Sequence, residues 1–143
     1  MTLPRPIPGL VIRYSFLWSD EARAGAEEGS KDRPCAIVLT AQRADTGEIS
    51  VTVAPVTHAP PDEDDSVEVP AKVARALGLD GKRHWIRIDE LNRFSWPGYD
   101  LRTIPGRPAE YAYGMLPEAL YRALRRAILE RDRRIRAKIQ GRG

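Results

Sequence analysis

The chain of 143 residues has the length of one compact domain, and with 42% hydrophobic and 30% charged residues its composition is that of an ordinary globular protein. Of the formal net charge of +3, Leu116–Gly143 contributes +6 through nine Lys+Arg and three Asp+Glu, so the preceding residues carry −3. Such a basic segment favours a polyanionic or acidic partner, although a solvated helix face has the same composition. Since no apolar run reaches the ~18 residues of a membrane span and the N-terminus lacks a signal-peptide pattern, we expect a cytoplasmic protein.

Cys35 is the single cysteine. It can form neither an internal disulfide nor a cysteine-rich zinc site. It begins the apolar run Cys35–Leu39, where cysteine behaves as a small hydrophobe. We therefore expect Cys35 in the core.

The first half of the chain predicts three strands. The first is a segment of alternating residues whose apolar members are Leu10, Ile12, Tyr14, Phe16 and Trp18. After the polar segment 19–32, Cys35–Leu39 predicts a second strand, and the turn ADTG at 44–47 joins it to a third strand over 49–54. The two form a hairpin. The segment after Pro55, VTHAPPDEDD, is expected to leave the sheet.

The second half predicts a mixture of strands and helices. Val67–Val69 and Trp85–Asp89 read as short strands, and the segment from Pro70 to Gly78 reads as a short helix. A longer helix is indicated by apolar residues at helical spacing, which are Leu116, Leu120, Leu124 and Ile128. Beyond Glu130 the sequence is mostly charged, and we expect the last turns to project or fray.

These elements predict one domain over 1–143, with a core at about 8–128 and a basic C-terminal extension at 129–143. The expected fold is mainly β (α+β), a small antiparallel barrel or rolled sheet with a short helix and a C-terminal helix packed on the sheet.

Metal and nucleotide chemistry have no motif in this sequence. His58 and His84 are far apart in the chain and no HExxH is present. PDEDD lacks the spacing of a calcium loop and reads as an exposed acidic loop. Glycine-rich phosphate loops and GxSxG are also absent. A metal is therefore unsupported rather than excluded, and no cofactor is implied.

The remaining polar groups at strand ends are cations, carboxylates, a threonine and a histidine. These are the groups needed to cleave RNA without a metal. A base removes the proton of the 2′-hydroxyl, an acid protonates the leaving oxygen, and cations stabilise the charge that develops at phosphorus. Arginine suits the last role, because its planar donors grip phosphate oxygens and its charge is permanent.

Five segments in order resemble the PemK/MazF toxins of bacterial toxin–antitoxin pairs: PGLVIRY, RPCAIVLT, VTVAPVTHAPP, IRIDELNRFSW and an LPEAL helix. The resemblance covers about Pro8 to Ile128. It implies an SH3-like barrel and a sequence-specific endoribonuclease that cleaves single-stranded RNA as a homodimer without a cofactor. It also implies an antitoxin whose disordered acidic tail covers the RNA groove, and operator DNA contacted through that antitoxin.

The resemblance also implies site residues. Arg33 stands where the family's Arg-Pro arginine binds the scissile phosphate, and Thr57 stands where a threonine completes that site. Arg87 and Asp89 match the acid and base of some members. Glu28 corresponds to a loop glutamate that assists substrate contact, with Glu27 as a competing assignment.

Two further residues, Lys31 and His58, are expected to bind RNA, and His58 could also donate a proton near neutral pH. Structural alternatives remain open at the other positions. Arg33 and Asp89 could simply pair across the sheet, and His84 is expected at the surface. The tryptophans are expected more often in the core or a dimer interface than stacked on bases; they are Trp18, Trp85 and Trp96.

The loop at 19–32 departs from the family pattern because it is longer than in most members and its glycine is displaced to Gly29; the PIPGLV start of the first strand departs as well. A longer loop could change the recognised RNA sequence. It could also misplace Glu28 or Arg33, so the alternative is a non-catalytic module of the same fold that binds nucleic acid or a protein partner. A third alternative is a structural protein that assembles through its basic helix.

Overall fold

The structure is a computed structural model that describes residues 3–18, 32–59, 64–98 and 100–140, with the side chains of 136–140 excepted. The predicted site residues Glu28 and Lys31 lie outside these ranges, as do Glu27 and Gly29. The elements in chain order are β1 (Leu10–Ser15), β2 (Asp32–Gln42), β3 (Ile49–Thr57), β4 (Ser66–Val69), α2 (Ala71–Ala76), β5 (His84–Arg87), β6 (Asn92–Trp96), β7 (Ala112–Met115) and α3 (Glu118–Gln140).

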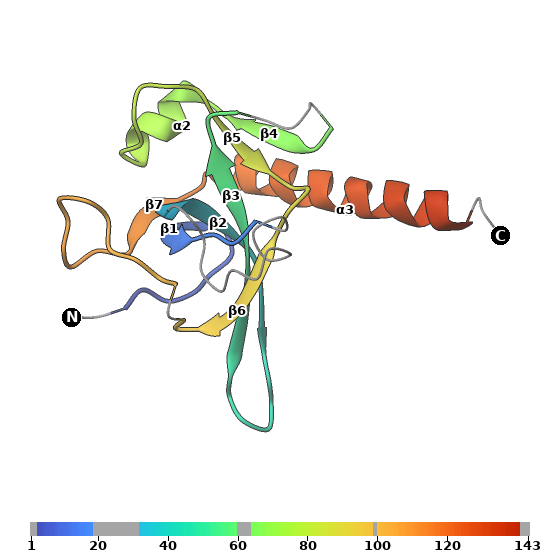
Figure 1. Cartoon of the computed structure of the whole chain (residues 1–143), viewed down its shortest axis with the longest axis horizontal. Coiled ribbons are helices and arrows are strands. Elements are labelled where there is room, and N and C mark those ends of the chain that lie inside the picture. The colour runs from blue at the N-terminus through green and yellow to red at the C-terminus, as the bar shows by residue number, and fades with distance from the viewer. Residues whose placement is uncertain (1–2, 19–31, 60–63, 99, 141–143) are drawn as a thin grey trace.

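One curled antiparallel sheet forms a half-barrel, with strand order β4-β5-β3-β2-β1-β7 and β6 also paired with β3 (Figure 1). The long strand β3 serves two neighbours. Its residues Ile49–Val53 pair with β6, and its last two residues pair with β5, Val56 opposite Ile86 and Thr57 opposite Trp85. The predicted class, a mainly β small barrel with helices, is confirmed.

The sheet buries both of its faces. Leu10, Ile12 and Tyr14 of β1 and Phe16, directly after this strand, belong to one apolar cluster, as their alternation predicts, together with the buried Cys35. Val11, between them, belongs to a second cluster that includes Ala36, Val38 and Leu124 of α3. The second face is apolar because α3 covers it, which adds to the single apolar face expected from the sequence.

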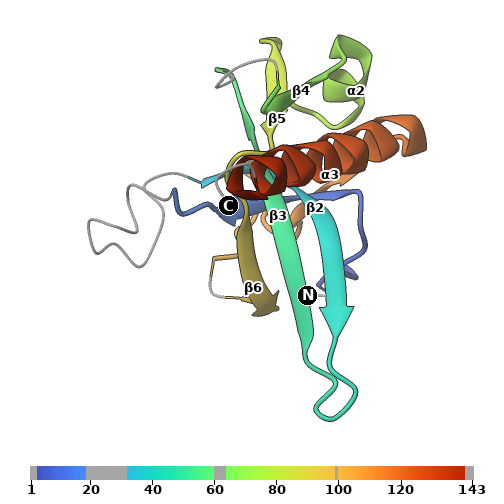
Figure 2. The ribbon, with the colours of Figure 1, turned by 90° about the vertical axis from the view of Figure 1, so that its right-hand side faces the viewer.

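Helix α3 crosses β2 and β3 (Figure 2) and packs with the predicted side chains against the sheet, Leu124 fully buried and Leu120 and Ile128 partly so. The Tyr121 hydroxyl donates to the carbonyl of Val38 at 3.1 Å. The helix continues past Glu130 to Gln140, and Arg131 donates to Asp65 at 3.0 Å. Of the two expected alternatives, the helix therefore does not fray after Glu130, and its last turns project beyond the sheet (Figure 1). Neither described helix contains a stretch long and apolar enough to cross a bilayer.

Several boundaries differ from the sequence-based prediction. Strand β2 begins at Asp32, so Arg33 lies within it, and β3 runs through Pro55 to Thr57 instead of ending before that proline. The strands β6 and β7 were not predicted. Segment NRFSW of β6 has few apolar residues, and its strand conformation comes from pairing with β3 over five residue pairs. This is tertiary context overriding weak local preference.

Candidate functional site

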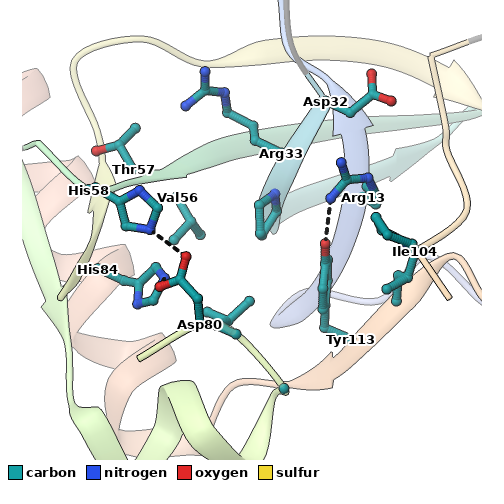
Figure 3. A pocket seen from close by; sticks show the side chains of 14 residues that line it. Arg13, Asp32, Arg33, Val56, Thr57, His58, Asp80, His84, Ile104 and Tyr113 are labelled. Atoms are coloured by element: carbon teal, nitrogen blue, oxygen red, sulfur yellow. Dashed lines mark hydrogen bonds and ion pairs between the residues drawn. The ribbon is translucent and has the colours of Figure 1, made fainter. Parts of the chain in front are cut away.

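A pocket of about 410 Å³ opens where the ends of β1, β2 and β3 meet the loop between α2 and β5 (Figure 3). This volume falls in the range of small-ligand sites. The described residues that line it are Arg13, Asp32, Arg33, Pro34, Val56, Thr57, His58, Gly78, Leu79, Asp80, His84, Ile104, Pro105 and Tyr113.

Arg33 and Thr57, which the resemblance assigns to one phosphate site, both line this pocket. The β2–β3 hairpin places them, because Cys35 pairs with Pro55 and antiparallel register brings the residues two positions further out together. Thr57 is buried, and its Oγ1 donates to the carbonyl of Ala59 at 3.0 Å. The hydroxyl proton is used in this hydrogen bond, so the Thr57 oxygen can only accept a further hydrogen bond from a ligand.

Arg87 and Asp89 are bound to each other at the end of β5. Arg87 Nε donates to Asp89 Oδ1 at 2.9 Å, and a second guanidinium nitrogen donates to Oδ2. Burial raises the pKa of Asp89, but the hydrogen bonds and charge of Arg87 outweigh it, so the pKa of this carboxyl lies below its usual value. A carboxylate of lowered pKa is a weaker general base.

Trp18 links this pair to the pocket. The guanidinium carbon of Arg33 lies 5.1 Å from the centre of the Trp18 ring, and that of Arg87 lies 4.6 Å from it. Neither Arg87 nor Asp89 is among the described residues that line the pocket. The four predicted residues therefore divide into Arg33 and Thr57 in the pocket wall, and an ion pair beside it that contacts the same indole as Arg33.

His58 and His84 lie together, although 26 positions of sequence separate them (Figure 3). Their ring centres are 4.8 Å apart, and both rings face Asp80. His58 Nε2 lies 3.0 Å from Asp80 Oδ2, and His84 Nε2 lies 3.2 Å from Asp80 Oδ1. Contrary to what was expected, their separation in sequence does not keep these histidines apart, because the pairing of Thr57 with Trp85 sets the next residues, His58 and His84, side by side.

His84 is buried rather than exposed at the surface, so that expectation is also wrong. As the first residue of β5 it pairs with Val69, and its side chain points inward. Burial lowers the pKa of His84, with Asp80 acting in the opposite direction. The pKa of Asp80 is lowered chiefly by the amide of Lys82, which donates to its carboxylate at 2.9 Å.

Three pocket residues were not predicted from the sequence: Arg13, Asp80 and Tyr113. Arg13 projects from β1, and its guanidinium donates to the Tyr113 hydroxyl at 3.0 Å, which orients it in the wall (Figure 3). A signal for Arg13 existed, since it is the one charged residue in the alternating segment 10–18. Nothing local marks Asp80 or Tyr113, whose place in the wall depends on the folded sheet.

The tryptophans differ in their surroundings. Trp18 and Trp96 are partly buried and pack on the apolar cluster of β1, as expected for core residues. Trp85 is partly buried on β5, where Arg83 lies over its ring at 4.8 Å.

The described pocket wall carries two guanidinium groups, Arg13 and Arg33, a hydroxyl and two imidazoles, which are groups that can bind an anion, together with the carboxylates of Asp32 and Asp80. No family model, curated protein or solved structure matches this chain. The likeness to PemK/MazF toxins therefore depends on the five sequence segments alone.

Proposed function

We propose that the chain is an endoribonuclease toxin of a toxin–antitoxin pair that cleaves single-stranded RNA without a metal ion. One observation carries the proposal: Arg33 and Thr57, assigned to one phosphate site from separate segments, line the same pocket together with Arg13. A phosphate in this pocket would lie among permanent positive charges and a hydroxyl, the groups that stabilise a pentavalent phosphorus.

The reaction is an intramolecular transfer. The 2′-oxygen of the RNA forms a bond to the adjacent phosphorus, the bond from phosphorus to the 5′-oxygen breaks, and the products carry a 2′,3′-cyclic phosphate and a free 5′-hydroxyl. A base takes the 2′-hydroxyl proton and an acid returns one to the 5′-oxygen. Arg33 and Arg13 hold the phosphate oxygens, and His58 contacts the RNA beside them.

The acid and base are assigned to Arg87 and Asp89 by the resemblance. Their mutual hydrogen bonds hold both groups in the charged form. Bound RNA must therefore open this pair before either group exchanges a proton with the substrate. Trp18 lies against both Arg87 and Arg33, so a base stacked on this indole would compete with their cation–π contacts.

The proposed partners follow from the same charge pattern. An acidic, disordered antitoxin tail would complement the Arg13 and Arg33 side of the pocket and exclude RNA from it. The active form would be a cytoplasmic homodimer whose paired sheets build the RNA groove, and operator DNA would be contacted through the antitoxin.

The test is cleavage of an unstructured RNA by the purified chain in excess EDTA. We expect discrete products with 5′-hydroxyl ends, which accept a labelled phosphate from a kinase without prior phosphatase treatment. Arg33→Ala should abolish cutting with an unchanged circular dichroism spectrum. The matched control is Arg43→Ala in the β2–β3 turn, whose exposed side chain pairs with Asp45 and should be neutral.

The Arg87–Asp89 pair favours a second candidate, a binding module without turnover, because two groups that satisfy each other are poorly placed to transfer protons. That function is correct if RNA is retained by the chain on a filter but never shortened. Cutting that disappears in EDTA and returns with zinc would contradict the metal-independent mechanism and leave the ribonuclease function standing.

A further inference from the structure

Three metal-ligating side chains meet at one edge of the pocket. They are His58, directly after β3, Asp80, in the loop after α2, and His84, the first residue of β5 (Figure 3). Each offers one ligand atom, and these atoms all lie within 4.8 Å of one another. We propose that His58, Asp80 and His84 bind one divalent transition-metal ion, for which zinc is the best fit.

The donor set is the first argument for zinc. Two imidazole nitrogens and one carboxylate oxygen match the three-ligand arrangement of open zinc sites, in which a water or substrate takes the fourth position. Magnesium and calcium prefer sites made of oxygen alone, so two imidazoles disfavour them.

The distances are the second argument. Ligands bound tetrahedrally to zinc at its usual bond lengths are separated by about 3.3 Å. Asp80 Oδ2 lies 3.0 Å from His58 Nε2, and Asp80 Oδ1 lies 3.2 Å from His84 Nε2. With either oxygen of Asp80 as the ligand atom, its separation from one imidazole nitrogen is thus already close to that of the bound state. The other separations are at most 4.8 Å, so the side chains must move closer together as the ion binds.

One of the three proposed ligands is held in place by burial, while the other two are accessible from the pocket. The His84 side chain is only 5% exposed, whereas His58 and Asp80 are 47% and 51% exposed and line the pocket. Nδ1 of His84 is buried and has no hydrogen-bond partner among the described residues, so Nε2 is the nitrogen that this ring presents to the cluster. An ion can therefore enter from the pocket and meet a preset nitrogen.

Other described groups are poor competitors for the ion. Cys35 is fully buried and its pKa is raised by that burial, which disfavours the thiolate that metals bind. Asp65, in the acidic segment before β4, accepts hydrogen bonds from Arg131 and Arg134. The described pocket wall carries the carboxylates of Asp32 and Asp80 as well as its two arginines, and Asp80 lies at the edge where the cation would bind.

The experiment titrates the untagged full chain with zinc against a chromogenic chelator, since a histidine tag would itself bind the ion. We expect one zinc per chain with micromolar or tighter affinity. Cobalt at the same site should show the visible absorption of a four-coordinate ion. His58→Asn and Asp80→Asn should each weaken zinc binding by at least about 100-fold. Asp45→Asn, which removes an exposed carboxylate in the β2–β3 turn, is the control and should leave the affinity unchanged.

His84→Asn removes a buried side chain and can unfold the chain, so the conclusion depends on the exposed His58 and on Asp80, each checked for folding by circular dichroism. The proposal is overturned if no zinc binds where the chelator resolves micromolar affinity. It is equally overturned if binding survives both substitutions, because the ion would then lie elsewhere. The site does not rest on the proposed ribonuclease function, since zinc binding is measured without RNA and RNA cleavage is measured in EDTA.

Discussion

Arg87 and Asp89 form an ion pair closed by two hydrogen bonds, with side chains only 21% and 17% exposed. The same guanidinium lies over Trp18, which Arg33 also contacts. This pair stabilises the folded sheet end and, in the proposed enzyme, would have to open for proton transfer. Its two roles can be separated by substitution.

The first prediction concerns the stability of this pair. Arg87→Ala leaves a mostly buried carboxylate without its partner, and we expect a loss of about 1–3 kcal/mol in the free energy of unfolding. The measurement is urea denaturation followed by fluorescence. Asp89→Asn and the double variant complete a double-mutant cycle. If the loss of unfolding free energy in the double variant equals the sum of the losses in the two single variants, the two side chains are not coupled.

The second prediction is a dependence of stability on acid pH. Because the folded-state pKa of Asp89 is lowered, its contribution is present above the unfolded value of about 3.9 and is lost as the pH falls through the folded value. We expect the free energy of unfolding to fall more steeply below pH ~4 in the wild type than in Arg87→Ala. Parallel curves for the two proteins would contradict this origin of the pKa shift.

The third prediction concerns alkaline pH and Cys35. Burial raises the pKa of this thiol, so its contribution to stability is complete below the unfolded value of about 8.5 and is lost as the pH rises above it. Cys35→Val should therefore lose less stability between neutral and strongly alkaline pH than the wild type. The readout is the unfolding midpoint across this range. The pKa of Tyr14 is also raised by burial, so this residue serves as a comparison. Tyr14→Phe should remove a different part of the dependence of the unfolding midpoint on alkaline pH.

The fourth prediction concerns the end of α3. Asp65 accepts hydrogen bonds from Arg131 at 3.0 Å and Arg134 at 3.4 Å, which fasten the helix to the segment before β4. Asp65→Asn should speed amide exchange from Arg131 onward and change global stability by less than ~1 kcal/mol. Glu118→Gln, which disrupts the exposed pair with Arg122, should leave exchange in these last turns unchanged.

The fifth prediction tests the phosphate contact of Arg13. Arg13→Ala should weaken binding to single-stranded RNA and reduce the slope of log affinity against log salt by about 0.7, the value for one lost phosphate contact. Arg43→Ala is the control. If Arg13→Ala weakens RNA binding but leaves the salt dependence unchanged, Arg13 positions Tyr113 and does not contact a phosphate.

Local patterns predicted much of the sheet. The alternation around Ile12 and the hairpin turn at 44–47 predicted β1, β2 and β3, because a two-residue period requires only that alternate side chains share a face. The helical spacing of Leu120 and Leu124 predicted α3 in the same way. Strand β6 lacks such a pattern, and its conformation depends on its partner β3.

The hairpin of β2 and β3 could be predicted from the sequence, because its turn and its alternating residues are local signals, whereas the extension of these strands to Arg33 and Thr57 is seen only in the folded sheet. The meeting of His58, Asp80 and His84 could not be predicted from the sequence. Their meeting depends on pairing between β3 and β5 and on the course of the loop after α2. Such contacts join residues that are distant in the chain. The periodicity of side chains indicates which face of a strand is buried but not which strand lies beside it, so these contacts are seen only in the assembled sheet.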